Sequence, residues 1–299
     1  MKAPVKPALA SVGPSGETAI RPPELTEINP PIGFWSGPAR MWRNARENRH
    51  LLYNFIQRDI RLKYRDSALG YFWSLLEPLM MSAVYFILYV IIAGKPDPRY
   101  PLWVILGVIT WSFFTKAVSD SLVCLTRNEG MIKQVYFPRE LFALTSVGSA
   151  LALTLLNLLV AIPLLLIYRI PPTPYLLMVP VGLLLTALLG LGIGMGMACL
   201  NVVNRDVDFF FRFLTRAGVF LAPVMWTVEM APPSKAKWID YLLLNPMAVP
   251  ITMVRDGIAG ERLGIGAGHV AYSVGFCLFS FLLGSMFFMR YEAFTIKKL

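Results

Sequence analysis

Arginine residues recur at helical spacing in two places along the chain, and guanidinium groups at that spacing are suited to binding phosphate. The two groups are Arg58, Arg61 and Arg65, and Arg212 and Arg216. A guanidinium donates two parallel hydrogen bonds to phosphate oxygens. Asp208 precedes Arg212 by four residues, so the two side chains can form an ion pair. These arginines are candidates for binding anionic headgroups; alternatively, they only flank membrane segments and attract bulk anionic lipid.

Further ionisable side chains lie inside apolar stretches, where an unpaired charge is costly. Glu77 is followed by Pro78, which bends a helix because it lacks a backbone donor. The Glu77 carboxylate therefore either has a partner close to this kink or faces a polar lumen. Lys116 and Asp120 stand four residues apart, a spacing that favours a structural ion pair over a proton relay.

The residue patterns of common enzyme and metal sites are missing from the sequence. There is no G-x-x-x-x-G-K-[ST] phosphate loop, no nucleophile elbow and no zinc-ligand spacing. The two histidines, His50 and His269, lie in separate segments, and three cysteines stand singly: Cys124, Cys199 and Cys277. We expect no catalytic residue, no metal and no bound cofactor in this chain, so any ATP-driven activity needs a separate ATPase.

Six apolar stretches must position these side chains. They cover residues 71–93, 102–125, 146–168, 175–201, 209–226 and 270–289. A helix rises about 1.5 Å per residue, so roughly 20 residues cross the ~30 Å hydrocarbon core of a bilayer. The sequence therefore predicts an all-α membrane protein with six transmembrane helices.

The composition agrees with a membrane protein, since 56% of the 299 residues are hydrophobic and 15% are charged. The net charge of +10 could indicate a nucleic-acid partner, but in a membrane protein it more often reports basic cytoplasmic flanks, and we expect no nucleic acid. Lys and Arg are more numerous beside the two termini and in the connections after the second and fourth apolar stretches than in the other connections. Both termini are therefore expected in the cytoplasm.

The chain before the first apolar stretch divides into two parts. Residues 1–49 begin with a proline-rich segment over 1–34 that lacks the apolar core of a signal peptide, and we expect a disordered cytoplasmic tail with a basic lead-in. Residues 50–66 are expected to form an amphipathic interfacial helix, which is either a plain anchor or an anionic-lipid site. The six-span domain then covers 67–299.

Shorter helices are expected between the spans. Residues 127–140 are polar and basic, and a connection of this length suits a helix that contacts a cytoplasmic partner. Two apolar pieces, 238–244 and 247–258, are broken at Asn245-Pro246 and are too short to cross. They are typical of re-entrant helices, which are tolerated where protein or a watery cavity covers their backbone.

Glycines alternate within the fourth apolar stretch, at Gly190, Gly192, Gly194 and Gly196. A dinucleotide-binding loop is excluded because the context is a membrane helix rather than a strand, turn and helix. Small residues spaced by four instead allow another helix to approach closely.

Several segments resemble the permease subunits of ABC exporters for bacterial cell-surface polysaccharides, the ABC-2 type. The segment RDIRLKYRDSALGYFWSLLEPLMM at 58–81 is similar to the entry segment of these permeases. The resemblance continues through GMIKQVYFPRELFAL, NRDVDFFFRF, FLAPVMW and LNPM, in family order over 50–290. The 1–34 extension lies outside it.

This resemblance implies a homodimer of six-span subunits that binds two copies of a cytoplasmic ABC ATPase, which holds ATP and Mg. Its substrate would be a lipid-linked polysaccharide such as O-antigen, capsule or teichoic acid, moved from the cytoplasmic to the outer side of the cell inner membrane, among membrane lipids. A secondary transporter and a membrane glycosyltransferase of envelope glycan assembly are the alternatives. The chain shows no inverted repeat, and Asp97 alone is weak support for glycosyl transfer.

The resemblance also implies roles for individual residues. The two arginine groups would flank the substrate phosphate at a lateral entrance. A translocation canal would be lined by Glu77, Tyr85, Tyr89, Trp111, Phe113 and Phe114, although aromatic residues of this kind are also common in packing. A coupling helix would contact the ATPase through Asn128, Glu129, Lys133 and Gln134.

Overall fold

A computed structural model describes residues 37–67, 69–93, 97–134, 138–230 and 236–296. Every regular element within these ranges is a helix, which confirms the predicted all-α class. The proline-rich segment 1–34 lies outside the described residues, so its state stays a prediction.

Five stretches of the described chain are long and apolar enough to cross a membrane. They are formed by α3 (Phe72–Ala93), α4 (Tyr100–Leu122), α7 (Glu140–Leu158) with α8 (Ala161–Ile167), the 3-10 turn η2 (Pro174–Leu177) with α9 (Met178–Val203), and α13 (Ala267–Ile296). They coincide with five of the six predicted stretches. The protein is therefore an integral membrane protein with several apolar helices.

The sixth predicted stretch, 209–226, coincides with α10 (Asp206–Leu221), a helix of 16 residues. It is shorter than a bilayer-spanning helix, and its first turn contains Asp206 and Asp208. The helix ends at Leu221 because Ala222 precedes a proline and takes an extended conformation, with φ −88° and ψ 150°. The structure therefore shows five candidate spans, and the sixth predicted span stays a prediction.

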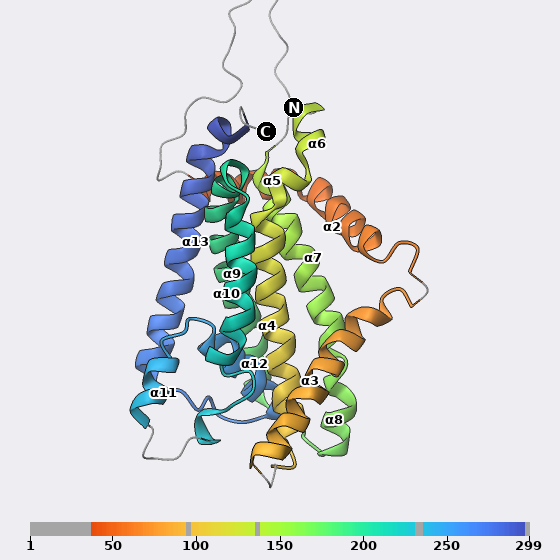
Figure 1. The fold of residues 1–299 in the computed structure, drawn as a ribbon, viewed down its shortest axis with the longest axis vertical. Helices are drawn as coiled ribbons and strands as arrows, with labels where there is room; N and C mark the ends of the chain where they lie inside the picture. Colours follow the sequence, from red (N-terminus) through yellow and green to blue (C-terminus); the bar gives the residue numbers. More distant parts are fainter. Residues whose placement is uncertain (1–36, 68, 94–96, 135–137, 231–235, 297–299) are drawn as a thin grey trace, which may run out of the picture. The chain divides into compact units, whose positions relative to one another are not determined.

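Helix α9 packs between α4 and α13 (Figure 1). Its glycines allow this, as the small-residue spacing predicts. A Cβ atom on Gly190 would lie 2.6 Å from the Cβ of Ala117 on α4, and one on Gly284 of α13 would overlap the backbone of Gly192. The backbones of α9 and α13 therefore touch at Gly192 and Gly284.

Two helices precede the first span. The sequence did not predict α1 (Gly37–Glu47), which buries Met41 and lies against the backbone of Met286 on α13. A helix, α2 (Arg49–Lys63), lies where the interfacial helix is predicted, and none of its residues is fully buried; its place at a membrane interface stays a prediction. It is inclined to α7 and contacts it (Figure 1), and its Phe55 stacks on Phe142 with ring centroids 5.8 Å apart.

The remaining short helices also follow the predicted positions. After α4 come α5 (Cys124–Arg127) and α6 (Glu129–Gln134), where a coupling helix is expected. A 3-10 turn, η3 (Val228–Met230), and α11 (Ala236–Leu242) follow α10. The next helix, α12 (Ala248–Ala259), is almost entirely buried and packs on α9 and α4.

Candidate functional site

A cavity of about 360 Å³ opens between α3, α4 and α10, and we call it the α3–α4–α10 cavity. Its lining comprises Glu77, Met81 and Tyr85 from α3, Val108, Trp111, Ser112, Thr115 and Lys116 from α4, and Thr215, Arg216, Val219 and Phe220 from α10. Lining residues recur every three or four positions on each helix, so each helix presents one face to the cavity. Four of the predicted site residues therefore meet here: Glu77, Tyr85, Trp111 and Arg216.

The carboxylate in this cavity has a partner on the next helix. The Lys116 ammonium donates a hydrogen bond to a Glu77 carboxylate oxygen at 3.0 Å. The Lys116 side chain is 22% exposed and that of Glu77 is 59% exposed. The predicted pairing of Lys116 with Asp120 is wrong, because Lys116 reaches Glu77 on α3 while Asp120 lies 3.8 Å from Arg127.

Arg216 is the second cation of the cavity. It forms no hydrogen bond or ion pair with any other residue in the described part of the chain. The neighbouring threonine hydroxyls are occupied, since Thr115 donates to the carbonyl of Trp111 and Thr215 to that of Phe211. The guanidinium of Arg216 is thus available to a ligand.

The predicted canal aromatics divide between the cavity and the core. Tyr85 and Trp111 line the cavity, whereas Phe113 is fully buried and Phe114 packs on Trp111 with centroids 5.3 Å apart. For Phe113 and Phe114, packing is the role that this structure supports.

Tyr89 is also outside the cavity and belongs to a cluster at the far end of α3. Its ring stacks on that of Tyr100, with ring centroids 3.8 Å apart, and the Tyr100 hydroxyl donates a hydrogen bond to the carbonyl oxygen of Met225 at 2.8 Å. This cluster joins α3, α4 and the segment that follows α10.

The remaining predicted arginines do not share one pocket. Arg58 pairs with Asp59 at 2.8 Å, and Arg65 lies 3.7 Å from Asp66. Arg212 pairs with Asp208 at 2.9 Å, as predicted, and lines a separate cavity of about 400 Å³ with Arg127 and Arg205. Arg61 is exposed on α2. Only Arg216 of the two predicted groups lines the α3–α4–α10 cavity.

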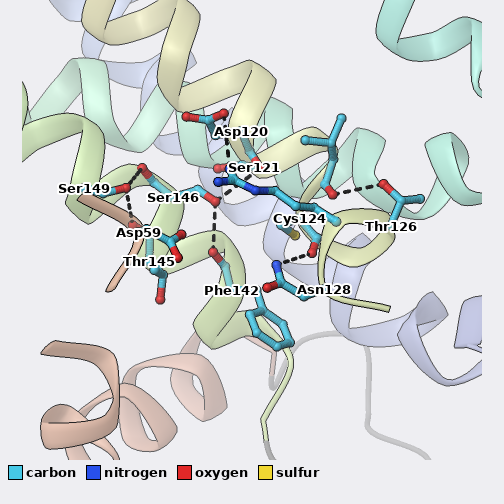
Figure 2. A network of polar contacts seen from close by, with 12 residues as sticks. Asp59, Asp120, Ser121, Cys124, Thr126, Asn128, Phe142, Thr145, Ser146 and Ser149 are labelled. Atoms are coloured by element: carbon cyan, nitrogen blue, oxygen red, sulfur yellow. Dashed lines mark hydrogen bonds and ion pairs between the residues drawn. The ribbon is translucent and has the colours of Figure 1, made fainter. Parts of the chain in front are cut away.

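A second charged cavity of about 310 Å³ lies between α2, α4 and α7, and we call it the α2–α4–α7 cavity. Its polar lining comprises Asp59, Lys63, Lys116, Asp120, Arg127, Ser146 and Ser149, and Figure 2 labels Asp59, Asp120, Ser146 and Ser149. Ser146 donates to the backbone carbonyl of Asp120 at 3.2 Å, which joins α7 to α4. Burial, and then the charge of Lys116, lowers the pKa of Lys63. Lys116 lines both cavities.

The predicted ATPase-contacting residues lie on or beside α6. Asn128 donates to the carbonyl of Cys124 at 2.8 Å and accepts from Arg58 at 3.5 Å, so α2 is linked to the α5–α6 segment. Lys133 pairs with Glu129 at 2.6 Å. Gln134 is exposed at the end of α6.

Sequence reasoning missed the polar residues that complete the α3–α4–α10 cavity, namely Ser112, Thr115, Lys116 and Thr215. Only Thr115, four positions after Trp111, had a usable signal, because residues spaced by four share one helix face. No sequence pattern indicated that Lys116 pairs with Glu77, because the two residues lie on different helices.

Comparisons with known proteins agree with this architecture. Residues 50–259 match the family model described as ABC-2 type transporter. An O-antigen export system permease protein RfbA of Myxococcus xanthus is 25% identical over 260 residues, which cover 86% of this chain and 98% of the relative.

Two other relatives match at similar levels. An O-antigen export system permease protein RfbA of Klebsiella pneumoniae is 26% identical over 229 residues, 76% of this chain and 87% of the relative. The polysialic acid transport protein KpsM of Escherichia coli is 26% identical over 246 residues, 79% of this chain and 92% of the relative. Because the family model covers more than half of the chain, the predicted resemblance is confirmed, and this chain belongs to the ABC-2 type transporter family as a membrane permease.

Proposed function

We propose that this chain is the membrane subunit of an ATP-driven exporter that moves a lipid-linked polysaccharide from the cytoplasmic to the outer side of the cell inner membrane. The names of the relatives support this choice, since they are permeases of O-antigen export and a polysialic acid transport protein. O-antigen and capsular polysaccharide are the first substrates to test, and teichoic acid is the third.

The observation that carries the proposal is the chemistry of the α3–α4–α10 cavity. Tyr85 and Trp111 line the cavity with aromatic rings, a residue type on which sugars stack, and the hydroxyls and cations beside them suit a glycan that carries phosphate. A site of this composition binds a polar, anionic molecule at the depth of an apolar bilayer. An apolar substrate would leave the Arg216 guanidinium and the hydroxyls of Tyr85 and Ser112 without a hydrogen-bond partner among the described residues.

A second copy of the chain is expected to complete the passage. The outward face of α3 exposes Leu79, Met80, Val84, Ile87 and Ile91, and that of α10 exposes Phe209, Phe210, Phe213, Phe220 and Leu221. These faces border the cavity on both sides, so a homodimer that joins them encloses a canal. Lipid covers the parts that the dimer leaves open.

The proposal also covers how many times the chain crosses the membrane and on which side its termini lie. Counting α10, whose charged first turns lie at the cytoplasmic surface, gives six spans with both termini in the cytoplasm. Helix α2 lies at the interface, with Arg61 on the helix and Arg65 just after it near the headgroups. Helices α11 and α12 enter the membrane from the outer side.

ATP and Mg are bound by two copies of a separate ABC ATPase. The sequence has no phosphate loop, so the chain is a transporter subunit rather than an enzyme by itself. Helix α6, with Asn128, Glu129, Lys133 and Gln134, is the proposed contact with this ATPase.

Reconstitution with and without a cognate ABC ATPase tests the function. In vesicles, glycan transport is expected only when both proteins and ATP are present, because this chain has no nucleotide site. A catalytically inactive ATPase, which keeps the complex together, is the matched control. Transport driven by a proton or sodium gradient without the ATPase would show that the chain is a secondary transporter.

A further inference from the structure

The geometry points to Lys116 and Arg216 as the site that holds the phosphate group of a lipid-linked substrate within the α3–α4–α10 cavity. This inference rests on the proposed function and specifies where the substrate's anionic group is bound. The sequence predicted that the two arginine groups together flank the phosphate. The inferred site instead consists of one cation on α4 and one on α10.

Charge balance is the first argument for this site. The charged groups that line the cavity are Glu77, Lys116 and Arg216, two cations against one carboxylate. Glu77 neutralises Lys116 at 3.0 Å, whereas Arg216 has no ion pair among the described residues. An unbalanced cation among apolar helices is costly, and a bound anion removes that cost.

Depth is the second argument. Lys116 lies six residues before the end of α4, and Arg216 lies ten residues after the start of α10. These two helix ends lie on the same side of the helix bundle (Figure 1). At about 1.5 Å per residue, the cations are about 9 Å and 15 Å inside that surface. A lipid phosphate can reach this depth when its chain remains among the apolar side chains of α3 and α10.

The hydrogen-bonding capacity of the wall is the third argument. Tyr85 and Ser112 line the cavity and make no side-chain hydrogen bond with any described residue, so their hydroxyls can donate to a ligand. Arg216 can donate a forked pair of hydrogen bonds, and Lys116 has three donors, of which Glu77 uses one. The volume of about 360 Å³ exceeds that of a diphosphate group.

Glu77 is expected to act as the competitor of the phosphate. In the structure its carboxylate occupies one Lys116 donor and repels a second anion. A bound phosphate therefore draws Lys116 away from Glu77 or shares it. Removing the Glu77 charge should strengthen phosphate binding, whereas a merely structural ion pair would predict damage.

The test is equilibrium binding of farnesyl diphosphate to the full-length chain in phosphatidylcholine nanodiscs, without ATP or the ATPase. Farnesol, which has the same apolar chain without phosphate, is the neutral probe. We expect Lys116→Gln and Arg216→Gln each to weaken farnesyl diphosphate binding about tenfold, equivalent to ~1.4 kcal/mol. Farnesol binding should stay unchanged, and Glu77→Gln should bind farnesyl diphosphate at least about threefold more tightly, a change of ~0.7 kcal/mol.

Arg290→Gln is the matched control, because it removes one exposed positive charge at the end of α13 that lines neither charged cavity. Lys116→Arg keeps the positive charge and should retain binding. If it does, the weaker binding of Lys116→Gln comes from the missing charge and not from a failure to fold. Equal weakening by Arg290→Gln and Arg216→Gln would overturn the site in favour of general charge attraction. Weaker binding in Glu77→Gln would overturn it as well.

Two competitors distinguish the sources of phosphate. Inorganic pyrophosphate and phosphatidylglycerol are each expected to displace farnesyl diphosphate poorly. Equal competition by pyrophosphate would show a free-phosphate site, and equal competition by phosphatidylglycerol a bulk-lipid site; either result overturns the inference. Because the assay measures binding and not transport, such a failure leaves the proposed function to its own reconstitution test.

Discussion

At the scale of single residues, Arg255 is a charged residue buried in the protein, with a side chain that is 4% exposed. Its guanidinium donates to the backbone carbonyls of Pro223 and Trp226 at 3.2 and 3.3 Å and lies 3.5 Å from Asp256. These bonds attach α12 to the segment that follows α10. Because Arg255→Met removes the donor of two backbone carbonyls and the cation beside Asp256, we expect a loss of about 3 kcal/mol in unfolding free energy.

Thermal unfolding of the purified chain in detergent measures this effect. Arg262→Met is the matched control, since Arg262 is exposed a few residues further on and forms no side-chain hydrogen bond or ion pair with described residues. Equal melting temperatures for Arg255→Met and Arg262→Met would show that Arg255 does not hold α12.

At the scale of helices, packing depends on the crossing of α9 and α13. A methyl group on Gly284 would overlap the backbone of Gly192, whereas one on Gly275, also in α13, would meet nothing within 4 Å. We therefore expect Gly284→Ala to destabilise the fold by about 1–3 kcal/mol through overpacking, and Gly275→Ala to leave stability close to that of the wild type.

Melting temperature and the yield of monodisperse protein report on this pair. Equal behaviour of the two alanine variants would mean that α9 and α13 do not meet at Gly192 in the folded protein.

At the scale of the whole transporter, the proposed function requires motion of the ATPase to reach the membrane helices, and α6 and α2 are the proposed route. Glu129 and Lys133 form a half-exposed ion pair on α6, and Asn128 contacts Arg58 on α2. Glu129→Lys alone places two cations one turn apart, and we expect it to reduce glycan transport while ATP hydrolysis continues. The double change Glu129→Lys with Lys133→Glu restores the pair within α6 but reverses the surface that the ATPase meets.

Transport and ATP hydrolysis are measured together in reconstituted vesicles. If the surface contacts the ATPase, the double variant stays uncoupled. If it recovers full transport, the pair only stabilises α6, and the proposed contact is wrong.

Sequence patterns predicted the fold better than the site. Hydropathy located five long helices, because burial in a bilayer demands about 20 consecutive apolar residues wherever the helix packs. It did not predict α1, whose contact with α13 joins segments far apart in the sequence.

Ion pairs show why the site was harder to predict. The i,i+4 rule gave the pair of Asp208 and Arg212 correctly. It failed for Lys116 and Asp120, because Glu77 on α3 and Arg127 on α5 lie within reach in the folded chain. A rule based on one helix cannot rank partners that other helices supply.

The stacked rings of Tyr89 and Tyr100, with the bond from Tyr100 to Met225, have a mechanical consequence. They join α3, α4 and the segment after α10 at one end of the α3–α4–α10 cavity. This end can act as a pivot. Lys116 lies 16 residues along α4 from Tyr100, about 24 Å away. A swing of about 10° around this pivot moves Lys116 by about 4 Å, enough to part it from Glu77. The α3–α4–α10 cavity can therefore widen at the Lys116 end while its opposite end stays closed, as the proposed entry of a lipid requires.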